Sequence, residues 1–406
     1  MIRERPPIRH LAVLWSRLGP YHVARLDALR TFLTARDMAL SVVETASTDR
    51  TYAWEAQGGD RTTLFPGRAF ESVPGPEMEA AVREALDRID PDAVAVPSYS
   101  TPDARAALAW CRRRRRAAVM MFDSRQQDAA RAGWRERIKR TVVRQFDAAL
   151  VAGTPQRAYA VALGVPPSHV FQPVDVVDNA RFARLAADAR QSRPAGDRGR
   201  FLVVSRLTPV KGVDVLLDAY RQYRASAADP WALDVVGDGP ARAALEAQAG
   251  AGVSFHGFAQ GDALGLAYGR ADALVLPSHK DTWGLVVNEA MAAGLPAVVS
   301  WGAGCAEDLV EEGANGFTVP PGDAAALADR LGRVAALSDA ERRDFGNRSR
   351  EIIAAYDLDA FCRGLWDAAQ AGQSRADRGL SPSGRLTLGA LRLLARHPRA
   401  FQAIPD

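Results

Sequence analysis

The chain has 406 residues, which is enough for two or three domains of ordinary size. Apolar residues make up 48% and charged residues 25% of it, a balance typical of globular proteins with substantial cores. The sequence contains no run of about 18 apolar residues, and its charged start lacks the apolar stretch of a signal peptide. The 3 cysteines are far apart and match neither a metal-binding spacing nor a disulfide framework, so we expect a cytoplasmic protein without a bound metal.

The net charge of +4 is unevenly distributed. Residues 105–144 contain 13 basic and 3 acidic side chains, which gives the first half of the chain a basic face. Within 131–146, apolar side chains recur at roughly helical spacing, and the arginine run 112–116 is close by, so the candidate segment is 112–146. This pattern fits peripheral docking on an anionic membrane, or a helix packed on the core with a solvated basic face. No nucleic-acid recognition module accompanies the charge, so we do not expect nucleic-acid binding.

Short apolar runs alternate with amphipathic stretches along the chain. Strands are predicted over 11–15, 92–98, 117–123, 148–154, 201–205, 232–238, 253–258, 272–278 and 296–300. Continuous apolar strands separated by helices indicate parallel sheets that are covered on both faces. The predicted fold class is therefore α/β, with two Rossmann-like, doubly wound domains. Ligands of such sheets bind at the carboxyl ends of strands, so we expect the site in a central cleft that both domains face.

Polar and Pro/Gly-bearing stretches suggest where the domains divide. We predict an N-terminal domain over 1–188, a linker over 189–200 and a C-terminal domain over 201–370. The remaining 371–406 would form a tail and helix that pack back toward the N-terminal domain.

In chain order, Gly19 follows the first strand and precedes a helix. The N–H groups and positive dipole of a helix start suit phosphate, although an ordinary turn explains the same residues. Beside it, His22 is either a structural histidine or a side chain that faces the cleft.

Arg206 and Lys211 lie in the loop after the strand 201–205. Two cations before a helix could clamp a diphosphate, and they could also be solvated surface charges. Further on, Gly237 and Gly239 match only part of a dinucleotide fingerprint, because Arg242 stands at its third position. We interpret that stretch as a tight turn.

The stretch "DTWGLVVNEAMAAGLP" follows the strand 272–278 and contains two acids, Asp281 and Glu289. We predict a loop and then a helix that ends at Gly294, with Asp281 outside the helix. The two acids would bracket a ligand and bind sugar hydroxyls, while backbone N–H groups between them contact a phosphate. The alternative is that Asp281 caps the helix and Glu289 is a surface charge.

Together these stretches resemble the family-four retaining glycosyltransferases of the GT-B fold. That family carries the motif E-x-F-G-x-x-x-x-E-A-M-A-x-G-x-P and the loop G-R-L-x-x-x-K-G. The corresponding segments are "DTWGLVVNEAMAAGLP" (281–296), "SRLTPVKG" (205–212), "VVGDGP" (235–240), "FHGF" (255–258) and "PVDVVDNARF" (173–182). The resemblance covers nearly the whole chain and is strongest over 200–320.

The resemblance implies a hexosyl transfer from a nucleoside-diphosphate sugar to an acceptor hydroxyl, with retained configuration and without a metal or other cofactor. UDP is favoured over GDP as the donor nucleotide. The acceptor would be a surface polysaccharide, a glycolipid, a metabolite or a lipid-linked sugar. It would bind to the N-terminal domain. Arg206 and Lys211 would hold the diphosphate, Glu289 the ribose and Asp281 the transferred sugar. The other donor-binding residues would be Gly19, His256, Phe258, Trp283, Gly284, Leu285 and Val286.

Three departures from the family pattern stand out. Asp281 replaces the first Glu of the motif and Trp283 replaces the usual Phe, which could change the pocket's size. The histidine that many members carry after a first-domain strand is missing from "MFDSRQQD", where Asp123 or Ser124 could stand in.

Two other functions remain open. A nucleotide-sugar 2-epimerase could share the architecture, but it would lack the 281–296 motif. A catalytically silent nucleotide-sugar-binding partner is suggested by Asp281, whereas the intact Arg206, Lys211 and Glu289 oppose it. Turnover of the donor would separate a transferase from a silent binder.

Overall fold

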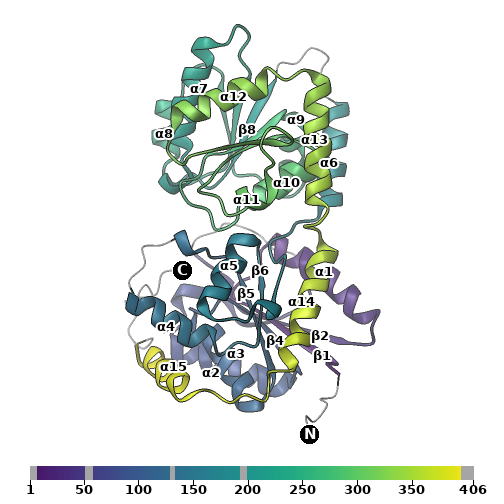
Figure 1. Cartoon of the computed structure of the whole chain (residues 1–406), viewed down its shortest axis with the longest axis vertical. Helices are drawn as coiled ribbons and strands as arrows, with labels where there is room; N and C mark the ends of the chain where they lie inside the picture. The colour runs from purple at the N-terminus through teal and green to yellow at the C-terminus, as the bar shows by residue number, and fades with distance from the viewer. Residues whose placement is uncertain (1–6, 51–57, 129–132, 193–198, 395–406) are drawn as a thin grey trace. The chain divides into compact units, whose positions relative to one another are not determined.

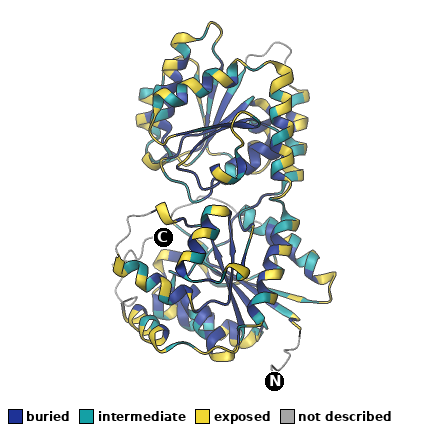
Figure 2. Ribbon diagram, viewed as in Figure 1, coloured by how far each residue is buried: buried dark blue, intermediate teal, exposed yellow. Residues whose placement is uncertain are grey.

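A computed structural model describes residues 7–50, 58–128, 133–192 and 199–394 of the chain (Figure 1). The chain forms two compact units. Unit 1 comprises the chain up to Asp175 together with the segment from Leu358 onward, and unit 2 is Val176–Asp357. In both units the strands are buried in the centre and helices surround them (Figure 2).

Unit 1 is built on a parallel seven-stranded sheet with the order β3-β2-β1-β4-β5-β6-β7. Its strands are β1 (His10–Trp15), β2 (Ala39–Thr48), β3 (Thr62–Ala69), β4 (Ala93–Pro97), β5 (Ala117–Phe122), β6 (Ala148–Val151) and β7 (Val170–Phe171). Leu11 of β1 aligns with Leu40 on one side and Ala93 on the other. Since all strands run the same way, their carboxyl ends lie along one edge.

The helices of unit 1 cover both faces of this sheet. They are α1 (Pro20–Thr34), α2 (Gly75–Ile89), α3 (Pro102–Arg114), α4 (Gly133–Val143), α5 (Thr154–Leu163), α14 (Leu358–Gln373) and α15 (Pro382–Leu394), with 3-10 turns at Phe70–Ser72, Gln126–Asp128 and Pro167–His169. Helix α3 packs against α2, β4 and β5, whereas α14 packs against α1 and strands β4 to β7. Helix α15 lies against α4 (Figure 1).

Unit 2 contains a parallel six-stranded sheet with the order β10-β9-β8-β11-β12-β13. Its strands are β8 (Arg200–Val204), β9 (Ala232–Val236), β10 (Val253–Gly257), β11 (Ala273–Leu276), β12 (Ala297–Ser300) and β13 (Gly316–Val319). The chain order reverses between β8 and β11, which are paired neighbours. This point is where doubly wound sheets bind their ligands.

The helices of unit 2 also form two layers. They are α6 (Asn179–Gln191), α7 (Val213–Ser226), α8 (Arg242–Gln248), α9 (Asp262–Arg270), α10 (Leu285–Ala292), α11 (Ala306–Leu309), α12 (Ala324–Ala335) and α13 (Asp339–Ile353), with a 3-10 turn, η4, at Pro209–Lys211. Helix α7 packs against α8 and α12, and α6 packs against α9 and α10. Across the described residues of both units, no helix is both long and apolar enough to span a bilayer.

All nine strands predicted from the sequence are present, with bounds that differ by a few residues. Four further strands, β2, β3, β7 and β13, were not predicted. β3 is an edge strand that contains Pro66 and Gly67, residues that obscure a strand pattern and are tolerated at sheet edges. β7 has only 2 residues, which is too short for a clear periodicity.

The units divide at other positions than the sequence analysis placed them. Residues 176–188 belong to unit 2, because α6 buries Phe182, Ala186 and Ala189 and packs against α9. Residues 358–370 belong to unit 1, because the apolar face of α14 packs on its sheet. The tail also belongs to unit 1 as far as it is described, whereas 193–198 of the predicted linker and 395–406 of the tail lie outside the described residues.

The arginine run 112–116 is largely neutralised within unit 1. Arg112 is buried and forms an ion pair with Asp147, whose side chain is 0% exposed. Arg113 and Arg114 lie near Asp87, and Arg116 lies near Asp90 and Asp92. The charge density seen in the sequence therefore overstates the positive charge that this segment presents.

Asp147→Ala should lower the free energy of unfolding by about 3–5 kcal/mol, because it leaves the buried Arg112 guanidinium without its carboxylate. Denaturant unfolding followed by circular dichroism measures the loss. Glu77→Ala, which removes an exposed pair with Arg68, serves as the control and should cost less than about 1 kcal/mol. Equal losses in both variants would contradict the structural role of the buried pair.

Candidate functional site

The candidate site of unit 2 lies where β8 and β11 end. The two strands are paired in parallel, so the loops that follow them leave the same edge of the sheet. Arg206 and Lys211 are in the first loop, and Asp281 is in the second. Residues separated by some 70 positions in sequence therefore meet at one place.

Lys211 and Asp281 form an ion pair. The Nζ–Oδ2 distance is 2.6 Å, and the side chains are 23% and 17% exposed. The cation predicted to hold a diphosphate is thus paired with the carboxylate predicted to hold a sugar. Arg206 is exposed, and no ion pair to it occurs among the described residues of the unit.

Two glycines bring the loop after β8 into backbone contact with the loops after β11 and β9. Gly212 has φ +66°, and a Cβ there would lie 2.4 Å from the carbonyl oxygen of Pro277 in the β11 loop. Gly237 has φ +141°, and its Cβ would lie 1.8 Å from the carbonyl oxygen of Ser205. Both positions exclude any other residue, and Gly237 acts as the predicted tight turn.

Helix α10 begins at this edge. Its N-cap is Gly284, which has φ +105°, and a Cβ there would lie 2.8 Å from the side chain of Leu276. The helix ends before Gly294 as predicted. The N–H groups of Leu285 and Val286 are in the first turn and have no partner within the helix, which is the usual arrangement at an anion-binding helix start.

Two predicted donor contacts are buried instead of open. Trp283 is 2% exposed, donates its Nε1–H to Asn288 at 2.9 Å and stacks near Tyr356. The indole of Trp283 therefore fills the core in this structure, and its contact with the donor stays a prediction.

Glu289 is 0% exposed and accepts a hydrogen bond of 2.5 Å from the hydroxyl of Tyr268. It is therefore not the surface charge that was the alternative. The sequence analysis missed Tyr268 and Asn288. A glutamate inside the apolar run of α10 is a signal that a buried partner must exist, but it does not identify that partner.

The segment after β10 contributes one open aromatic ring. Phe258 is 48% exposed, so its face is available to a planar ligand. His256 is engaged differently, with its Nε2 2.8 Å from Asp234 on the neighbouring strand β9.

Unit 1 has a different arrangement at the start of α1. The N–H of Gly19 donates to Nδ1 of His22 at 2.8 Å, so the amide predicted to contact phosphate is already used. That bond leaves Nε2 of the neutral ring as the nitrogen that carries the proton. The ring of His22 also lies 4.1 Å from that of Trp15, centroid to centroid.

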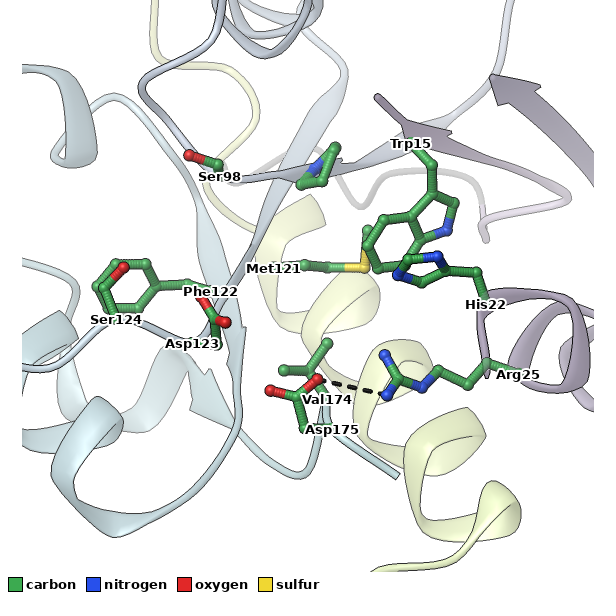
Figure 3. A pocket seen from close by; sticks show the side chains of 11 residues that line it. Trp15, His22, Arg25, Ser98, Met121, Phe122, Asp123, Ser124, Val174 and Asp175 are labelled. Atoms are coloured by element: carbon green, nitrogen blue, oxygen red, sulfur yellow. Dashed lines mark hydrogen bonds and ion pairs between the residues drawn. The ribbon is translucent and has the colours of Figure 1, made fainter. Parts of the chain in front are cut away.

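His22 borders a pocket of about 190 Å³ at the carboxyl edge of the unit 1 sheet (Figure 3). The pocket brings together the three residues that the sequence left undecided, His22, Asp123 and Ser124. It is lined by Trp15, His22, Arg25, Pro97, Ser98, Met121, Phe122, Asp123, Ser124, Val174 and Asp175. The indole Nε1 of Trp15 is buried without a hydrogen-bond partner among the described residues.

The charges of the pocket are partly balanced. Arg25 is 2% exposed and lies 3.3 Å from a carboxylate oxygen of Asp175 (Figure 3). Burial lowers the pKa of Arg25, and Asp175 opposes that shift. Burial and then the charges of Arg25 and Arg17 lower the pKa of His22 below its usual value, so this histidine is neutral at pH 7.

Within the described residues, no group of three or more His, Cys, Asp or Glu side chains has the arrangement of a metal site. Neither the unit 2 edge nor the unit 1 pocket therefore presents a metal-binding cluster. The charged groups available for chemistry are the arginine, lysine and carboxylate side chains already described.

Comparison with known proteins finds a family match within unit 2. Residues 186–352 match the model of the family described as "Glycosyl transferases group 1". The sulfoquinovosyl transferase SQD2 of Arabidopsis thaliana is 40% identical over 186 residues, which are 44% of this chain and 34% of that protein. A GDP-mannose-dependent alpha-mannosyltransferase of Mycobacterium tuberculosis is 33% identical over 196 residues, which cover 48% of this chain and 49% of the relative. The chain thus spans about half or less of the length of these relatives.

Solved structures share the fold of both units. A sucrose-phosphate synthase from Thermosynechococcus elongatus has a TM-score of 0.68 at 20% identity, with 88% of this chain and 97% of that chain covered. Anabaena HepE in complex with UDP and glucose has a TM-score of 0.66 at 18% identity, with 88% and 98% covered. The chain has the GT-B fold, as predicted.

His22 should make unit 1 less stable in mild acid. Its pKa is lowered in the folded state, so below about pH 6.5 the unfolded chain binds a proton that the folded chain does not. Stability is therefore complete above that pH and falls as the pH drops. Because the ring faces an open pocket, we expect a loss of about 1–2 kcal/mol between pH 7 and 5. Denaturant unfolding of the wild type and of His22→Gln at several pH values measures this component. Parallel pH profiles of the two proteins would contradict it.

Proposed function

We propose that the chain is a glycosyltransferase that moves a hexosyl group from a nucleoside-diphosphate sugar to a hydroxyl of an acceptor, with retained configuration. The observation that carries the proposal is the convergence of Arg206, Lys211 and the start of α10 at one edge of unit 2. It lies within the part of the chain that matches the group 1 family. Departure of a nucleoside diphosphate builds negative charge, and positioned cations and helix-start amides stabilise such charge.

In this proposal Arg206 and Lys211 hold the diphosphate, and the N–H groups of Leu285 and Val286 contact its oxygens. Lys211 exchanges Asp281 for phosphate when the donor arrives, and Asp281 then accepts hydrogen bonds from the sugar. These groups can stabilise the leaving diphosphate without a metal ion. Retention would follow from attack on the face from which the diphosphate leaves, with its oxygens taking up the acceptor's proton.

The nucleotide would lie toward β10, with its base against Phe258. We favour UDP over GDP, and a structural neighbour binds UDP. The mannosyltransferase relative named as GDP-mannose-dependent makes GDP the next choice. Glu289 would bind the ribose only after the Tyr268 hydroxyl gives up its hydrogen bond, so donor binding should rearrange this part of unit 2.

The acceptor would bind in the unit 1 pocket. Its lining combines an aromatic wall with hydroxyl, carboxylate and N–H groups, which suits a sugar or another polyol. Two carboxylates, Asp123 and Asp175, face one guanidinium, Arg25, and His22 is neutral. This balance favours an uncharged, hydroxyl-rich group over a phosphate at that point. We propose that the group belongs to a surface polysaccharide, a glycolipid or a metabolite.

The proposal includes a cytoplasmic location. The three cysteines are buried and free, which is compatible with a reducing compartment. The alternatives remain a 2-epimerase-like enzyme and a silent nucleotide-sugar-binding partner. An epimerase would convert the donor without losing its diphosphate, and a silent partner would bind the donor and leave it intact.

Arg206→Ala and Lys211→Ala should each raise the barrier for donor cleavage by about 2–4 kcal/mol, the scale of a lost electrostatic contact in a transition state. Release of nucleoside diphosphate from the donor sugar, in transfer or hydrolysis, measures the rate. As a control, Arg221→Ala removes an exposed arginine of α7 and should leave the rate of diphosphate release unchanged. If both site variants turn over like the wild type, the diphosphate clamp is refuted.

Asp123→Asn should lower kcat/KM for the acceptor about tenfold, because an amide accepts a weaker hydrogen bond from a hydroxyl than a carboxylate does. Donor hydrolysis without acceptor should not change. Asp90→Asn, at an exposed position outside the pocket, is the matched control. An equal effect on hydrolysis and transfer would remove Asp123 from the acceptor site.

A further inference from the structure

The adjacent helices α15 and α4 carry the three most exposed large apolar side chains of the described residues. Leu386 is 76% exposed, Leu393 is 60% exposed and Trp134 is 59% exposed. Helix α15 lies against α4, so the three side chains belong to one pair of adjacent helices (Figure 1). Isolated exposed apolar residues are ordinary, but a concentration on one pair of helices is characteristic of an interaction surface.

Helix α15 is apolar on two opposite sides. Leu388 and Leu391 face inward and pack on the core of unit 1. At 100° per residue, Leu386 and Leu393 project within roughly 20° of each other, on the side opposite to those residues. Leu388 and Leu391 pack on unit 1, whereas the packing of the unit does not account for Leu386 and Leu393.

The attachment of α15 is specific. Gln145, just after α4, donates its amide N–H to the hydroxyl of Ser381 and accepts from the backbone N–H of the same residue, both at 3.2 Å. A Cβ at Gly384 would lie 2.7 Å from the Gln145 side chain, so helix and unit approach closely. The outer leucines are therefore displayed by a fixed element and not by a loose tail.

The charged side chains of the two helices are almost entirely positive. Exposed arginines on or next to the two helices are Arg137, Arg140, Arg144, Arg385 and Arg392. The two helices contain one acidic residue, Glu136, which is already bonded to Tyr159 and lies 3.6 Å from Lys139. Of the five arginines, Arg392 has an acidic partner in Glu79. Exposed leucine and tryptophan side chains surrounded by arginines are typical of helices that lie in the interface of an anionic bilayer.

We propose that the outer face of α15, together with Trp134 and the arginines of α4, is a docking surface for an anionic lipid membrane. Leu386 and Leu393 insert between the acyl chains, Trp134 lies at the headgroup level and the arginines contact lipid phosphates. This places the contact on α4 and α15 and not on the arginine run 112–116, whose charges are largely paired. The proposal does not depend on the transfer reaction.

The test is sedimentation of the full chain with vesicles of phosphatidylcholine, with and without phosphatidylglycerol. The protein should bind the anionic vesicles, and the bound fraction should fall as salt is raised. Leu386→Ser combined with Leu393→Ser should weaken vesicle partitioning at least about tenfold, because the variant lacks the two apolar side chains that would be buried in the lipid. Arg140→Gln combined with Arg385→Gln should weaken binding to anionic vesicles and remove much of the salt dependence.

Leu266→Ser is the matched control, since it removes a 41% exposed leucine from α9 in unit 2 and should leave partitioning unchanged. All substituted residues are exposed, and equal thermal midpoints verify that the variants are folded. Absence of wild-type binding to anionic vesicles, or full binding by the double leucine variant, overturns the proposal. A wild-type dimer in light scattering that the double leucine variant dissociates, without vesicle binding, would make a second copy of the chain the occupant instead.

Discussion

The parallel pairing of β8 and β11 is the constraint from which the rest of the unit 2 site follows. It forces two distant loops to the same edge, where Lys211 and Asp281 meet at 2.6 Å. A partly exposed pair of this kind contributes on the order of 1 kcal/mol, so it holds both charges in position without locking them. An incoming diphosphate can therefore take the lysine, while the aspartate turns to sugar hydroxyls. The close backbone contact at Gly212 keeps the two loops in register for that exchange.

The sequence was informative where a strand is apolar throughout and a loop carries charge. Arg206, Lys211 and Asp281 could be placed at one edge because each follows a clear strand and all strands are parallel. Burial could not be predicted in the same way. Trp283 and Glu289 lie in a stretch that resembles a ligand-binding motif, yet their partners Asn288, Tyr268 and Tyr356 are determined by three-dimensional packing. Whether such side chains face a ligand or the core depends on where the neighbouring helices pack, and the local sequence pattern does not predict that packing.

The same limit explains the errors in unit boundaries and in surface charge. A Pro/Gly-bearing stretch predicts a loop, but the side on which α6 and α14 bury their apolar faces decides the unit to which each belongs. The arginine run 112–116 suggested a basic surface, whereas its partners Asp87, Asp90 and Asp147 come from elsewhere in unit 1. The exposure of the outer leucines of α15 could not be predicted either, because the sequence does not distinguish a leucine that faces solvent from one that packs on the core.

The central claim is that the edge of unit 2 binds a nucleoside diphosphate through Arg206, Lys211 and the start of α10. Calorimetric titration of the full chain with UDP, GDP, ADP, TDP and CMP, in the presence of a metal chelator, tests it most directly. The account predicts selective binding of one nucleoside diphosphate, with an affinity that falls at least about tenfold in Lys211→Ala because a charge-assisted contact is lost. A folded protein that binds none of the nucleotides, or a variant that binds as tightly as the wild type, would contradict it.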